Sequence, residues 1–99
     1  MTTFKITPRA KESLKEIGRY TLKKWGKEQR KAYLQSLDKR FAWLAERPKV
    51  GRLRNDIEDC YYCYRHKEHI IFYMVMPDHI AIIGIPHQTM DMHNYFDLN

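Results

Sequence analysis

Two cysteines and five histidines are the side chains of this 99-residue sequence best suited to chemistry, and all of them lie after residue 59. Cys60 and Cys63 have the C-x-x-C spacing of a zinc site or a redox pair. No second cysteine pair completes a tetrahedral set, although His66 and His69 lie nearby. On a strand, a separation of three residues sends the two sulfurs to opposite faces. We therefore expect structural thiols in a reduced cytosol, with no metal and no cofactor.

The histidines could transfer protons, because a neutral imidazole titrates near pH 7. Metal-free cleavage of RNA also requires cations at the scissile phosphate. Arg65 and Lys67 are the only cations after Arg54, so a nuclease would have to use the basic loop at 49–54 as well. A histidine in a turn or at a strand end is the commoner alternative.

Charge is divided unevenly along the chain. Residues 1–54 hold 16 of the 18 lysines and arginines and 5 of the 12 acidic residues, so this half is strongly positive and the second half is mildly negative. Such a surface attracts polyanions or an acidic protein segment. Acidic residues are interspersed and no DNA- or RNA-reading motif is present, so we expect no sequence-specific nucleic-acid binding.

Length and composition indicate a single domain over residues 1–99, with 43% hydrophobic and 13% aromatic residues to build one core. No apolar run approaches the roughly 20 residues of a membrane helix. The opening residues 1–5 lack the apolar core of a secretory signal. We expect a cytoplasmic protein without membrane contact.

The elements that position these residues begin with a predicted strand at 3–7, where apolar and polar residues alternate. Thr7 suits an N-cap and Pro8 the first helical position, so a helix begins there and ends at Gly26. A second helix is predicted from about Lys27 to Arg47, before a proline. A connection this short makes the two helices an antiparallel hairpin.

Three strands are predicted in the second half, at 60–65, 69–76 and 79–85, with a hairpin turn between the first two. The apolar run at 69–76 is typical of a central strand that is covered on both faces. The tail from His87 is predicted to be a loop or a short final turn. The expected fold is α+β, in the order β-α-α-β-β-β, with the helical hairpin on one face of a curved antiparallel sheet that contains a three-stranded meander.

Several motifs follow one another in a fixed order: Pro8–Ile17, Tyr20–Thr21, Trp25–Gln29, Tyr33–Pro48 with Gly51–Arg52, Tyr64–Arg65 with His69–Tyr73, and His87–Asp91. Together they resemble the ParE toxins of the RelE/ParE superfamily of bacterial toxin–antitoxin modules. The resemblance spans nearly the whole chain, and the ordered set is far more specific than any one motif.

The resemblance implies a toxin that is not an enzyme. Such a toxin inhibits DNA gyrase, stabilises its cleaved-DNA complex, and blocks replication and growth. It also implies a ParD-like antitoxin whose acidic, disordered C-terminal segment wraps the toxin. The positive first half of the chain fits that partner independently.

Two residues depart from the family pattern. Gly84 stands where a basic residue is usual, and Pro86 stands where an aliphatic residue is usual. If the basic residue contributes to poisoning, this chain is a weaker poison or uses another contact. The alternative is a ribosome-dependent, RelE-like mRNA interferase in which Arg65, His69 and His87 bind phosphate and transfer protons. A third possibility is a chain that binds an antitoxin but poisons nothing.

Two sets of site residues are expected. The target-binding set is Arg65, His69, His87, Met90 and Asp91. The antitoxin-binding set is Leu14, Ile17, Tyr20, Leu37 and Phe41. The sequence leaves open which helical positions form the antitoxin groove and which form the core.

Overall fold

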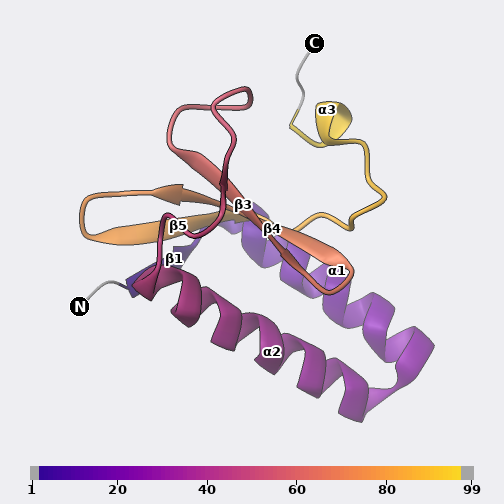
Figure 1. Cartoon of the computed structure of the whole chain (residues 1–99). Helices are drawn as coiled ribbons and strands as arrows, with labels where there is room; N and C mark the ends of the chain where they lie inside the picture. The colour runs from indigo at the N-terminus through magenta and orange to yellow at the C-terminus, as the bar shows by residue number, and fades with distance from the viewer. Residues whose placement is uncertain (1–2, 97–99) are drawn as a thin grey trace.

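The computed structural model describes residues 3–96, which form a five-stranded sheet with a helical hairpin on one face (Figure 1). The elements are β1 (Thr3–Ile6), α1 (Pro8–Trp25), α2 (Lys27–Glu46), β2 (Arg52–Leu53), β3 (Tyr61–His66), β4 (His69–Val75), β5 (His79–Gly84) and α3 (Met92–Tyr95). The predicted α+β class and the β-α-α-β-β-β order are confirmed, with the short β2 as an addition. Within this range no helix combines the length and apolarity needed to cross a membrane.

The sheet is mixed, in the order β1-β5-β4-β3-β2. The meander β3-β4-β5 is antiparallel as predicted. The expectation of a fully antiparallel sheet is wrong for β1, which runs parallel to β5 with Phe4 opposite Ile80 and Ile6 opposite Ile82. Two antiparallel helices return the chain to the end where β1 began, so β3 and β5 run in the direction of β1. A strand placed beside β5 is therefore parallel to it.

Thr7 joins β1, α1 and β5. Its N–H donates to the Ile82 carbonyl at 3.2 Å, and its Oγ1 donates to the same carbonyl at 2.9 Å. Thr7 Oγ1 also accepts from the Ala10 N–H at 3.2 Å, which confirms the predicted N-cap. At the other end of α1, Gly26 has φ 94°, a conformation that ends a helix without steric cost in glycine, as predicted.

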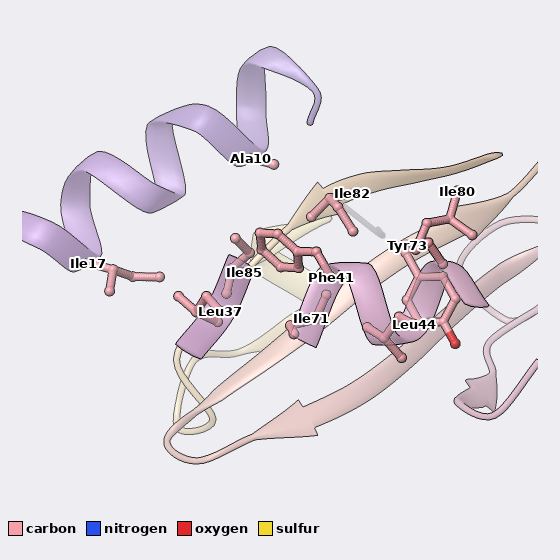
Figure 2. Packing of buried hydrophobic residues seen from close by; sticks show 11 residues of the cluster. Ala10, Ile17, Leu37, Phe41, Leu44, Ile71, Tyr73, Ile80, Ile82 and Ile85 are labelled. Carbon is pink, nitrogen blue, oxygen red and sulfur yellow. The ribbon is translucent and has the colours of Figure 1, made fainter. Parts of the chain in front are cut away.

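One hydrophobic core lies between the helices and the sheet (Figure 2). It contains Ala10 and Ile17 from α1, Leu37, Phe41, Leu44 and Ala45 from α2, and Ile71, Tyr73, Ile80, Ile82 and Ile85 from the β4 and β5 region. The Phe41 ring meets the Phe4 ring edge-on, with centroids 5.5 Å apart. β1 is thereby held to α2 as well as to β5.

The far face of β4 is covered as well, at one point. Phe72 points away from the helices and is fully buried. The Phe96 ring lies 4.7 Å from it in an edge-on arrangement, and the Arg54 guanidinium lies 5.9 Å from its centroid. β4 is therefore covered on both faces here, as its apolar sequence predicts. The tail beyond β5 supplies the second cover and carries the predicted short final turn as α3.

Replacing Thr7 with alanine should lower the free energy of unfolding by about 1–2 kcal/mol, because the helix loses its cap and β5 loses a hydroxyl donor. Urea denaturation followed by circular dichroism measures this change. Thr7→Ser keeps the hydroxyl and should lose much less. Equal losses in the two variants would assign the effect to packing of the methyl group.

Candidate functional site

The β3–β4 hairpin sends the predicted site residues to two faces. Arg65 is paired with Ile70, and His66 with His69. Paired residues share a face while neighbours along a strand alternate, so Arg65 lies on the face opposite to His69. The Arg65 Nε donates to the Lys67 carbonyl at 3.2 Å, within the hairpin turn. The structure therefore does not bring Arg65 together with the histidines.

His69 and His87 do come together at the end of the sheet. They form an antiparallel bridge, and their rings meet edge-on with centroids 5.3 Å apart. The Tyr33 hydroxyl from α2 lies 2.6 Å from His69 Nδ1. His69 is only 7% exposed. The role of Tyr33 could not be predicted from the sequence, since its helical spacing indicates only a residue that faces the core.

Burial controls the protonation of this pair. It lowers the pKa of His69 to about 4, a value to which the neighbouring His87 also contributes. Burial also raises the pKa of Tyr33 to about 12, with a further contribution from Glu68. At neutral pH the contact therefore joins a neutral phenol to a neutral imidazole. His69 is therefore uncharged at neutral pH and does not attract a phosphate electrostatically.

His66 has a structural role beside this pair. The Arg40 Nε, which can only donate, lies 3.4 Å from His66 Nδ1, so the ring proton is on Nε2. Nε2 lies 3.0 Å from Ser36 Oγ, which in turn donates to the Tyr33 carbonyl at 2.6 Å. Burial lowers the pKa of His66, and the Arg40 charge adds to that effect. The neutral ring ties the end of β3 to α2.

His87 is held against the β3–β4 turn. The Thr89 N–H donates to His87 Nδ1 at 3.2 Å, which places the ring proton on Nε2. Nε2 lies 3.9 Å from the Glu68 carboxylate, and the Gln88 N–H donates to the Glu68 carbonyl at 2.8 Å. Residues 87–89 are consequently fixed in place, while Met90 beyond them is 46% exposed.

A groove of about 370 Å³ separates α1 from the segment that follows β5. We call it the α1–tail groove. Its lining residues are Ser13, Glu16, Ile17, Tyr20, His69, Ile85, Pro86, His87, Thr89, Met90 and Tyr95. Three predicted target residues thus share one groove with two predicted antitoxin residues. Asp91 is exposed and does not line it, and its Oδ2 accepts from Asn94 Nδ2 at 3.2 Å in the turn that begins α3.

A second groove, of about 520 Å³, lies between α1 and α2. We call it the α1–α2 groove. Its apolar part comes from Leu14, Gly18 and Leu34, and its charged and polar part comes from Lys15, Arg19, Arg30, Gln35 and Asp38. Gly18 contributes to this space, because a Cβ there would meet only Arg30 Cδ and Leu34 Cδ1, both at 3.7 Å.

The predicted antitoxin residues fall in three places. Leu14 is half-buried in the α1–α2 groove. Ile17 and Tyr20 line the α1–tail groove, and Tyr20 is 49% exposed. Leu37 and Phe41 are fully buried in the core and have no surface for a partner to contact in this fold. The choice between groove and core is thereby resolved, and for these two residues the antitoxin assignment is corrected.

The cysteines are both free thiols. Cys60 lies outside the strand predicted to contain it, with φ 65°, and its N–H donates to Asn55 Oδ1 at 3.3 Å. Cys63 is paired with Phe72 and lies on the far face of the sheet. Among the side chains that the structure describes, no group of three His, Cys, Asp or Glu is placed to hold a metal ion.

The depressed pKa of His69 makes stability depend on pH. Its pKa falls from the ordinary 6.5 to about 4 on folding, so the unfolded chain binds the proton more tightly. The free energy of unfolding should therefore decrease by about 2–3 kcal/mol as pH falls from 6.5 to 4, at roughly 1.4 kcal/mol per pKa unit. Denaturation at several pH values should show a shallower decrease for His69→Gln. His79→Gln, at the start of β5 and away from His69, should keep most of the slope. Identical slopes for the unaltered protein and both variants would contradict the assignment of the pH dependence to His69.

The amino-acid sequence matches a known protein family over most of its length. The family described as "ParE toxin of type II toxin-antitoxin system, parDE" matches residues 4–92. Toxin ParE1 of Caulobacter vibrioides is 30% identical over 91 residues, covering 92% of this chain and 94% of the relative. Toxin ParE1 of Mycobacterium tuberculosis is 31% identical over 88 residues, covering 88% and 90%.

The fold is similar to that of a chain in a solved structure. A chain from a solved structure titled "Chromosomal ParDE TA system from P. aeruginosa" superposes with a TM-score of 0.75 at 18% identity, covering 88% of this chain and 96% of that one. The strand, helical hairpin and meander described above are thus shared with a chain of that system. The chain belongs to the ParE toxin family of type II toxin–antitoxin systems.

Proposed function

We propose that this toxin inhibits DNA gyrase by binding it and not by acting as an enzyme, and that a ParD-like antitoxin neutralises it in the cytoplasm. The observation that carries the first part is the fixed presentation of residues 87–91. Gln88 is hydrogen-bonded to the β3–β4 turn, His87 is bridged to His69, and Met90 is exposed beside them. A rigid, partly apolar projection of this kind suits recognition of a protein surface.

The placement of the cations favours binding over cleavage of RNA. Arg65 lies on the opposite face of the hairpin from His69. Lys67 lies 5.4 Å from the centroid of the Tyr33 ring, at the turn. His69 is neutral at pH 7 and its Nδ1 is engaged by Tyr33. His69 and His87 lie together, but Arg65, the cation that the mRNA-interferase alternative places with them, does not join them to stabilise charge at a scissile phosphate.

The antitoxin is expected to use the α1–α2 groove. Its apolar part would receive aliphatic side chains of an amphipathic segment, and Lys15, Arg19 and Arg30 would attract carboxylates of the same segment. The first 54 residues carry 16 of the 18 basic residues, so an acidic partner is also steered towards this face over a longer range. Tyr20, which is 49% exposed on the other side of α1, offers a second contact.

The decisive experiment is plasmid supercoiling by purified gyrase with added toxin, with and without ATP, scored for trapped cleaved DNA. We expect inhibition and cleaved DNA, with normal activity in a parallel in-vitro translation reaction. Active gyrase together with cleaved mRNA would establish the interferase instead. No effect in either assay would leave a chain that binds only an antitoxin.

Met90 tests the binding surface within that assay. Met90→Glu places a charge at the centre of the projection and should weaken inhibition roughly tenfold or more, the cost of a lost interface contact of about 1.4 kcal/mol. Met76→Glu is the matched control, because Met76 is 36% exposed at the β4–β5 turn, away from both grooves. Equal losses in the two variants would contradict a local target surface.

Gly18 tests the antitoxin groove. Gly18→Leu extends a side chain into the α1–α2 groove from a position where its Cβ would make only ordinary contacts. Co-expression should then show a toxin that still arrests growth but is no longer neutralised, with antitoxin affinity lowered roughly tenfold or more. Ala32→Leu adds the same side chain at an exposed α2 position that lines neither groove and should be neutralised normally. Normal neutralisation of Gly18→Leu would place the antitoxin elsewhere.

A further inference from the structure

The Tyr95 ring occupies a space that is open only because residue 84 is glycine, and we call this space the seat of Tyr95. Gly84 is paired with Phe72 and lies on the far face of the sheet. A Cβ at this position would overlap the Tyr95 hydroxyl and would lie 3.0 Å from ring atoms Cε2 and Cζ. Contacts that close are not tolerated, so the phenol rests directly on the backbone of β5. A residue with a side chain at position 84 displaces Tyr95.

Tyr95 is also held from the side of α1. Its hydroxyl lies 3.3 Å from Ser13 Oγ. The Arg9 guanidinium lies 4.2 Å from the centroid of the Tyr95 ring, and Arg9 Nη2 donates to the Tyr95 carbonyl. The neighbouring Phe96 ring packs on Phe72. The side chains that follow the start of α3 therefore connect this short helix to both α1 and the sheet.

These contacts hold the far end of the segment that presents Met90. The near end is fixed by the Gln88 N–H on the Glu68 carbonyl at 2.8 Å. Between the two attachments, the Met90 N–H donates to the His87 carbonyl and the Tyr95 N–H donates to the Asp91 carbonyl. Tyr95 and Met90 both line the α1–tail groove. If Tyr95 leaves its seat, the segment loses the contacts of this ring with Gly84, Ser13 and Arg9.

We propose that Tyr95, seated on Gly84, is a positioning residue that holds residues 87–91 in the arrangement with which the toxin meets its target. The proposal rests on the target role proposed above for residues 87–91, and it identifies the contact that keeps them in place. Gly84 acts through Tyr95 by leaving space for its ring. Arg9 and Ser13 steady the ring from α1.

The test compares Gly84→Ala and Tyr95→Ala with the unaltered toxin, in cells without antitoxin and as purified protein. Amide hydrogen exchange should accelerate about tenfold or more at Gln88, Met90 and Tyr95, as expected when a local contact worth about 1.4 kcal/mol is lost. The expression level needed to arrest growth should rise by a similar factor. Amides within β4 should exchange as before, which shows that the fold is retained.

Tyr95→Phe is the matched control. It removes only the contact with Ser13 and keeps the ring in its seat, so it should accelerate exchange and weaken growth arrest much less than Tyr95→Ala does. The double variant Gly84→Ala/Tyr95→Phe removes the oxygen that the new methyl group would overlap. It should recover part of the activity and of the slow exchange that Gly84→Ala alone has lost, which a general loss of stability would not do.

Three results would overturn the proposal. Unchanged exchange in Gly84→Ala would show that the seat does not hold the segment. Accelerated exchange with undiminished growth arrest would show that the position of residues 87–91 does not matter for toxicity. Failure of Tyr95→Phe to rescue Gly84→Ala would break the link between the two residues. Growth arrest does not presuppose gyrase, so active gyrase beside arrested growth would refute the proposed target and leave this inference standing.

Discussion

The hydrogen bonds of Thr7 to the Ile82 carbonyl fix the geometry on which the rest of the structure depends. They require β1 to end, and α1 to begin, beside the middle of β5. β5 and the chain after it continue past this point without β1 as a neighbour, up to the bridge between His87 and His69. α1 and the end of β5 must therefore run next to each other with a space between them. The α1–tail groove follows from where one threonine caps its helix.

β4 links the two faces of the molecule at this end of the sheet. On the helix face, His69 meets Tyr33 from α2, and on the far face Phe72 meets Phe96 from the tail. Both contacts bury polar or aromatic groups against a strand that cannot shift register without exposing its core residues. The segment that carries His87 and Met90 is thus held between elements that are rigid for independent reasons. If this segment binds the target as proposed, such support reduces the entropy that it loses when the partner docks.

Local signals in the sequence predict most of the fold, but they do not predict contacts between residues that lie far apart in the chain. Thr7 and Gly26 mark the ends of α1 through hydrogen bonds and backbone angles within a few residues, so their types alone predict them. The parallel placement of β1, the contact of Tyr33 with His69, and the seat of Tyr95 on Gly84 join residues far apart in the chain. Helical spacing likewise cannot separate Phe41, deep in the core, from Leu14, which lines a groove, because both face inward from their helices.

The two grooves lie on opposite sides of α1, and this constrains how one antitoxin could silence the toxin. A segment that fills only the α1–α2 groove would leave His87 and Met90 uncovered. Direct occlusion of the proposed target surface therefore requires the same chain to cross over α1, whose diameter is about 10 Å. An extended chain covers that distance in roughly three or four residues. Tyr20 lines the α1–tail groove and is exposed there. A short continuation of a segment bound in the α1–α2 groove is therefore sufficient to reach the tail.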